Sequence, residues 1–68
     1  MKKITIKYKR YYVKGEIESD NLNQAMLTAY FESENNTSYV YEIIDGEKIY
    51  NRDDIIKYWD KNDFYSKY

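Results

Sequence analysis

The sequence predicts a small single α+β domain of order β-β-α-β-β-α, with two helices packed on an antiparallel four-stranded sheet. Three observations indicate this fold. Two segments alternate polar and apolar residues, one segment repeats apolar residues at helical spacing, and an Asp-Gly turn separates two further strands. A chain of 68 residues suffices for one such domain. We therefore expect residues 1–68 to fold together, with 63–68 as a loosely docked tail.

The first two strands are expected at residues 3–8 and 11–18, because apolar and polar residues alternate in both segments. A two-residue turn at 9–10 would place Tyr8 opposite Tyr11. In that register the apolar residues of both strands face the core.

An amphipathic helix is expected to follow this hairpin. Asp20 or Asn21 can cap its first turn, Leu27 and Phe31 widen its apolar face, and residues 35–36 are a plausible end. Its apolar residues recur at i, i+3, i+4, i+7 and i+8. They are Leu22, Ala25, Met26, Ala29 and Tyr30.

Residues 38–44 are expected to form the third strand. Apolar side chains occur there at both parities, as in a strand that is covered on two sides. Asp45-Gly46 is the clearest turn signal in the chain, and residues 48–50 return as a short fourth strand.

The second helix is expected to start at Asn51, whose side chain can cap the amide of Asp54. Asp53 and Asp54 sit where the helix dipole favours negative charge. Beyond this helix, Phe64 and Tyr65 can fold back onto the domain. The helix residues expected to pack inward are Ile55, Ile56 and Trp59.

Composition limits the chemistry that the chain can perform. Without cysteine or histidine it has no disulfides, zinc-finger ligands or thiol or imidazole catalysts. Two glycines are too few for a phosphate-cradling loop, and capping accounts for Asp53-Asp54. We expect no enzyme activity, no cofactor and no metal. The basic N-terminal segment has no apolar signal region and no run reaches membrane-spanning length, so we expect a cytoplasmic protein without a membrane partner.

Charge is segregated along the chain although the formal net charge is only −1. Residues 1–14 carry six positive charges and no acid, and residues 15–47 carry eight acids and no base. Basic and acidic elements can therefore lie side by side and neutralise each other, or each can form a contact face. The candidate basic face comprises Lys3, Lys7, Lys9, Arg10, Tyr12 and Lys14. The candidate acidic face comprises Glu16, Glu18, Asp20, Glu32, Glu34 and Glu42.

Three interpretations of the basic face stay open. It can be a solvated strand protected by lysines, a contact with an acidic protein, or a nucleic-acid surface with Tyr12 stacking on a base. The slightly acidic total weighs against the nucleic-acid interpretation.

Ten tyrosines exceed what a 68-residue core needs, so several should lie at the surface. Exposed aromatic residues often anchor protein interfaces. The candidate anchors are Tyr39, Tyr41, Phe64, Tyr65 and Tyr68.

Residues with AT-rich codons (Phe, Tyr, Met, Ile, Asn and Lys) supply 37 of the 68 positions. In size and composition the chain resembles products of low-GC Gram-positive bacteria, their phages and mobile elements. We therefore expect a small binding protein that modulates or inhibits a host or partner protein, such as a defence, replication or transcription factor. The alternative is a nucleic-acid-binding accessory protein that uses the basic hairpin. A homo-oligomer could form through edge strands or opposite charges.

Overall fold

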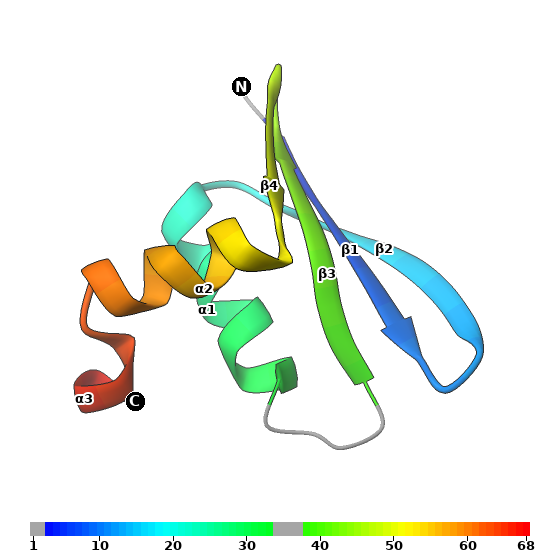
Figure 1. Cartoon of the computed structure of the whole chain (residues 1–68). Coiled ribbons are helices and arrows are strands. Elements are labelled where there is room, and N and C mark those ends of the chain that lie inside the picture. The colour runs from blue at the N-terminus through cyan, green and yellow to red at the C-terminus, as the bar shows by residue number, and fades with distance from the viewer. Residues whose placement is uncertain (1–2, 34–37) are drawn as a thin grey trace.

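The computed structural model describes residues 3–33 and 38–68. Its four strands form one antiparallel sheet in the order β2-β1-β3-β4. This architecture confirms the predicted α+β fold (Figure 1). Its elements are β1 (Ile4–Arg10), β2 (Val13–Ser19), α1 (Leu22–Ser33), β3 (Ser38–Asp45), β4 (Lys48–Asn51), α2 (Arg52–Lys61) and α3 (Phe64–Lys67).

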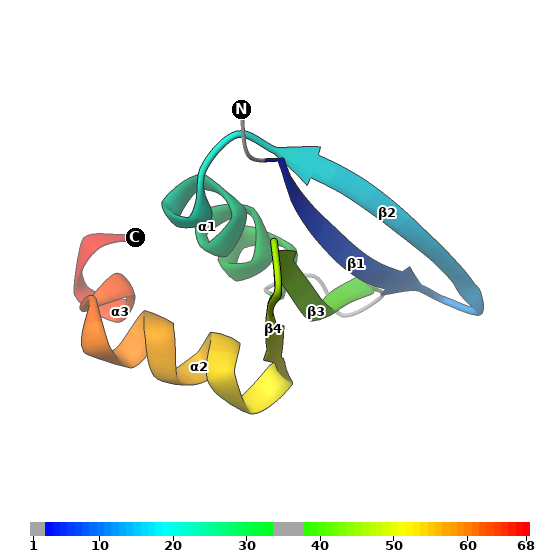
Figure 2. The same cartoon turned by 90° about the horizontal axis from the view of Figure 1, so that it is seen from above.

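The helices lie on one face of the sheet, as the two perpendicular views show (Figures 1 and 2). Helix α1 packs mainly on β3 and β1, while α2 packs on β3 and β4 and against α1. The hairpin of β1 and β2 extends beyond the helices (Figure 2). We call the side without helices the open face.

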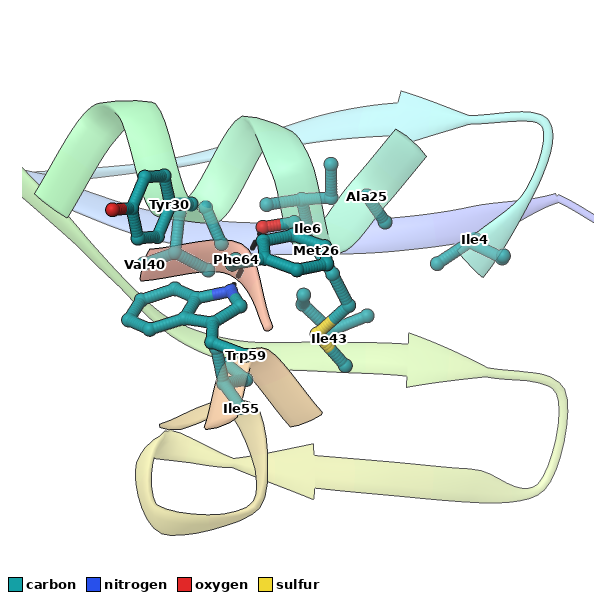
Figure 3. Close-up of a cluster of buried hydrophobic side chains, with 11 residues drawn as sticks. Ile4, Ile6, Ala25, Met26, Tyr30, Val40, Ile43, Ile55, Trp59 and Phe64 are labelled. Carbon is teal, nitrogen blue, oxygen red and sulfur yellow. Dashed lines mark hydrogen bonds between the residues drawn. The ribbon is translucent and has the colours of Figure 1, made fainter. Parts of the chain in front are cut away.

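The core lies between the sheet and the helices, and α1 supplies the closely spaced alanines that let it approach the strands. The indole Nε1 of Trp59 donates a 3.0 Å hydrogen bond to the carbonyl oxygen of Met26, which joins α2 to α1 (Figure 3). The buried apolar residues are Ile4, Ile6, Ala25, Met26, Ala29, Tyr30, Val40, Ile43, Ile55, Trp59 and Phe64. None of them comes from β2, so this strand is held by its pairing with β1 and by few core contacts.

The predicted register of the first hairpin was wrong. The turn lies at 11–12 rather than 9–10, and Tyr8 pairs with Gly15 rather than with Tyr11. Tyr11 has a φ of 56° and is exposed, so it does not face the core as expected. The observed register sets the ring of Tyr8 over the one residue of β2 that has no side chain, because a Cβ on Gly15 would lie 2.5 Å from that ring. Space for this ring is the physical reason for the later turn.

The interpretation of β3 as a strand covered on both faces was also wrong. Its register against β1 shifts between Lys7 and Tyr8, so that Lys7 pairs with Glu42 and Tyr8 with Val40. Tyr41 is the extra residue of this bulge. The shift places Val40 and Ile43 on the core side although they are three positions apart. The apolar residues at both parities of β3 therefore reflect the bulge, and they do not indicate a second layer covering the open face.

The predicted caps and the second hairpin are confirmed. The amide of Gln24 donates to Asn21 Oδ1 at 2.7 Å at the start of α1. At the start of α2 the amide of Asp54 donates to Asn51 Oδ1 at 2.9 Å, and the Asn51 amide donates to the Asp54 carboxylate at 3.3 Å. Between β3 and β4, Gly46 opens the turn with a φ of 63°, which favours glycine.

The second half of the chain differs from expectation at one core position. Ile56 was expected inside but is 39% exposed, because it follows the buried Ile55 by one residue and so lies on the helix flank. After α2 the chain reverses at Asp63, whose φ is 59°, and α3 begins with the buried Phe64. The helix end expected at residues 35–36 lies outside the described residues.

Candidate functional site

Aromatic side chains from all three helices gather at one end of the molecule. We call this set the aromatic cluster. It contains Tyr30 and Phe31 of α1, Tyr58 and Trp59 of α2, and Phe64, Tyr65 and Tyr68 of the segment that includes α3.

Tyr30 is the centre of the aromatic cluster. Its ring centroid lies 5.4 Å from that of Trp59, and 5.8 Å from those of both Phe64 and Tyr65, all in edge-to-face geometry. Figure 3 shows Tyr30, Trp59 and Phe64 close together in the core. Edge-to-face contacts at this distance add stability beyond the area that they bury. The inner part of the aromatic cluster is therefore a closely packed base for the rings around it.

Three rings of the aromatic cluster reach the surface, and we call them the aromatic patch: Phe31, Tyr65 and Tyr68. Their exposed fractions are 52%, 55% and 49%. Phe31 lies 5.9 Å from Tyr68, and Tyr68 lies 5.3 Å from the buried Phe64. Each exposed ring is thus held by another ring and keeps about half of its surface available.

The turn before α3 assembles the aromatic patch. The amide of Asn62 donates to the carbonyl oxygens at the end of α2, including that of Tyr58 at 3.0 Å. Asp63 then adopts the left-handed conformation that reverses the chain. Burial of Phe64 against Tyr30 completes the reversal. Residues far apart in the sequence are thereby brought to one surface.

Of the other three candidate anchors, Phe64 was wrongly expected at the surface, because it is buried against Tyr30, and Tyr39 and Tyr41 lie elsewhere. They belong to β3 and contact each other at 6.4 Å. The guanidinium of Arg52 lies between the rings of Tyr39, at 5.8 Å, and Trp59, at 5.4 Å. Its Nη1 also donates to the carbonyl oxygen of Val40 at 2.8 Å, where β4 no longer covers the edge of β3. Tyr39 therefore helps to close the sheet edge, and both tyrosines are separate from the aromatic patch.

The sheet order places the basic first strand between two acidic neighbours. Among the described residues, two ion pairs cross the sheet and a third joins β1 to α1, and each pairs a member of the candidate basic face with a member of the candidate acidic face. They are Lys3–Glu18 at 3.2 Å, Lys7–Glu42 at 3.5 Å and Arg10–Glu32 at 3.5 Å. Charges that are separated along the sequence thus lie next to opposite charges in the fold. This arrangement supports the interpretation that the basic and acidic segments neutralise each other.

The remaining members of the two charged sets are scattered. Lys14 lies 5.7 Å above the ring of Tyr41, and Lys9 pairs across the hairpin with Lys14 itself. Tyr12 is 95% exposed at the hairpin tip. Glu16 lies opposite Lys7 on the open face, and Asp20 is exposed before α1. Glu34 lies outside the described residues.

An open cleft of about 480 Å³ lies between β4 and α2. The lysines on its walls are Lys48, Lys57 and Lys61. Tyr58 also lines it, and its hydroxyl donates to Asn23 at 3.3 Å. Burial, and to a lesser degree the neighbouring Tyr50, raise the pKa of Tyr58 above its usual value. The spacing of Lys57 and Lys61, four residues apart, places both on one face of α2, but the cleft itself depends on the packing of β4 beside that helix.

Sequence reasoning also missed four members of the aromatic cluster as contact candidates: Tyr30, Phe31, Tyr58 and Trp59. The helical spacing places Tyr30 in the core and Phe31 on the widened apolar face of α1, and neither position predicts a surface contact. Their adjacency to each other was visible in the sequence, but their contact with Tyr65 and Tyr68 depends on the chain reversal at Asp63.

Comparison with protein-family models, with curated proteins and with solved structures finds no match to this chain. Within residues 3–33 and 38–68, no three acidic side chains come close enough to hold a metal ion. No helix in the same ranges has the length and apolar character needed to cross a membrane.

Proposed function

We propose that this chain is a small non-enzymatic binding protein that modulates a partner protein, and that the aromatic patch is its contact surface. The observation that carries this proposal is the arrangement of Phe31, Tyr65 and Tyr68, which are half exposed yet fixed by contacts with other rings. Tyrosine and tryptophan dominate the binding energy of protein interfaces, usually near their centre.

Prior ordering is what makes such rings effective anchors. A side chain that is already held loses little conformational entropy on binding, and that loss costs about 0.5–1.5 kcal/mol for a mobile side chain. The rings of Tyr65 and Tyr68 both contact Tyr30, at 5.8 and 6.3 Å. Binding then buries apolar surface of these rings while their side chains lose little further conformational entropy.

The chemistry of the aromatic patch defines the partner. Three ring faces favour an apolar protein surface, and the two phenol hydroxyls of Tyr65 and Tyr68 favour hydrogen-bonding groups around it. A nucleic acid would instead require cations beside the rings. The ion pairs of Lys3, Lys7 and Arg10 reduce the positive charge that the first hairpin can offer. They favour protein binding over the nucleic-acid alternative.

Composition alone supports the proposed source of the chain. Its AT-rich residue usage supports an origin in a phage or mobile element of low-GC Gram-positive bacteria. Small binding products of such elements commonly inhibit a host defence, replication or transcription factor, and inhibition is the form of modulation that we propose.

The test is an affinity capture from a low-GC Gram-positive lysate, with and without nuclease. Three baits are compared: the natural sequence, the double variant Tyr65→Ala/Tyr68→Ala, and the control Tyr12→Ala at the hairpin tip. The proposal predicts a protein that survives nuclease, is lost with the double variant and is retained by the control. Recovery of nucleic acid alone, or loss with Tyr12→Ala only, would contradict it.

A further inference from the structure

From the edge of the sheet we infer that β2 pairs with β2 of a second copy, forming an antiparallel dimer with one continuous eight-stranded sheet. Strand β2 is an edge strand of seven residues, and no described segment pairs with its outer side. Figure 2 shows it along the outer border of the sheet. An unpaired strand of this length is a template for another strand.

The backbone geometry of β2 is regular along this border. Its pairing with β1 continues without interruption from Val13 to Ser19. The residues beside a two-residue turn form a hydrogen-bonded pair, and such pairs alternate along an antiparallel ladder. The backbone groups of Lys14, Glu16 and Glu18 therefore point outward and are available to a second strand.

Strand β2 carries exposed apolar side chains that would be buried if a second strand paired with this edge. Val13 is 70% exposed and Ile17 is 42% exposed, although both lie on the helix side of the sheet. β-Branched residues at cross-strand positions stabilise a sheet by packing against each other. A second copy of the strand would supply the matching residues.

Complementarity selects one register. A two-fold axis at Gly15 places Val13 opposite Ile17 of the second copy, and Lys14 opposite its Glu16. Both pairs occur twice by symmetry. An axis at Glu16 would place Lys14 opposite Glu18 but would set the two copies of Glu16 against each other, and an axis at Ile17 would set Glu16 against Glu18. Like charges directly opposite each other destabilise a sheet, so the axis at Gly15 is favoured.

The same register relieves a repulsion within the single chain. Lys14 pairs with Lys9 across the first hairpin. In the dimer the carboxylate of Glu16 from the second copy lies beside Lys14 and balances this pair of cations. Because Lys14 and Glu16 of one β2 match Glu16 and Lys14 of another, the strand that pairs with this edge is β2 of a second copy.

Sedimentation velocity over a range of protein concentrations tests the dimer. We expect the natural sequence to dimerise, and both Lys14→Glu and Glu16→Lys to raise the dissociation constant roughly tenfold or more, since each replaces two opposite-charge pairs by two like-charge pairs. The charge swap Lys14→Glu/Glu16→Lys should restore the dimer. Circular dichroism verifies that each variant is folded. A natural chain that stays monomeric at millimolar concentration, or a swap that fails to restore association, would overturn the inference.

Disulfide trapping tests the register separately. The chain has no cysteine, so Val13→Cys/Ile17→Cys introduces the only two thiols. In the proposed register each thiol faces the other thiol of the second copy at a non-hydrogen-bonded pair, where Cα atoms lie about 4.5 Å apart and a disulfide is allowed. The double variant should oxidise to a covalent dimer with two disulfides. Dimerisation without cross-linking would contradict the axis at Gly15. Because neither position belongs to the aromatic patch, failure here leaves the proposed function standing.

Discussion

The ring of Tyr8 covers Gly15 across the first hairpin, so closely that a Cβ on Gly15 would lie 2.5 Å from the Tyr8 hydroxyl and Cζ. An aromatic ring over a glycine fills the space that the missing side chain leaves and shields the backbone below it. This contact fixes the register of β1 and β2, on which the position of the hairpin tip and the pattern of ion pairs depend.

Substitution of this glycine should therefore destabilise the protein. Gly15→Ala forces the ring of Tyr8 to move, and we expect the free energy of unfolding to fall by about 1–2 kcal/mol. Urea denaturation measures the change. In a Tyr8→Val background the same substitution should have little effect, and an equal loss in both backgrounds would show that the contact is not the cause.

A glycine substitution in the turn of this hairpin should instead stabilise the protein. Tyr11 is exposed and adopts a φ of 56°, a conformation that costs a residue with a Cβ about 1 kcal/mol. Tyr11→Gly should raise the free energy of unfolding by about 1 kcal/mol, less the entropy that glycine adds to the unfolded chain. Thermal denaturation gives the sign, and Tyr12→Gly serves as the control. A melting temperature below that of the natural sequence would contradict the strained turn.

The cap of α2 should contribute measurably. Asn51→Ala removes the acceptor of the Asp54 amide, and we expect a loss of about 1 kcal/mol in the free energy of unfolding. Asn51→Ser keeps an acceptor and should retain most of the stability. If both variants lost the same amount in urea denaturation, the side-chain hydrogen bond would not be the stabilising element.

Alkaline pH should weaken the fold through Tyr58. Its pKa is raised by burial and by Tyr50, so the folded chain holds this proton more tightly than the unfolded chain. Its contribution to stability is complete below the unfolded pKa of about 10 and is lost as pH rises through the raised folded pKa. Phenolate absorbance of the natural sequence minus that of Tyr58→Phe isolates this titration. A midpoint at or below pH 10 would contradict the assignment.

Local patterns in the sequence were sufficient for the four strands, for helices α1 and α2 and for most of the core, but not for α3. Ala25, Met26 and Ala29 repeat at helical spacing and are buried, and the Asn51 cap forms as its position predicts. These features depend on neighbours in the chain, so they can be inferred without knowledge of the remaining fold.

Features that depend on distant contacts were missed or incomplete. The turn residue Tyr11 is a poor match to turn preferences, and its position is set by Tyr8 reaching Gly15. The contact between Phe31 and Tyr68 requires the chain reversal at Asp63, and no local apolar pattern in the sequence predicts this reversal. Charge segregation was visible, but the individual ion pairs required the strand order.

The central claim is that the aromatic patch binds a partner protein. The most direct measurement is isothermal titration of the captured partner with the natural sequence, with Tyr65→Ala/Tyr68→Ala and with Tyr12→Ala, after circular dichroism has verified that all three are folded. Truncation of central aromatic anchors costs about 2 kcal/mol or more, which corresponds to a rise in dissociation constant of roughly thirtyfold. We predict at least this loss for the double variant and less than a threefold change for Tyr12→Ala. Equal affinity of the double variant and the natural sequence would contradict the account.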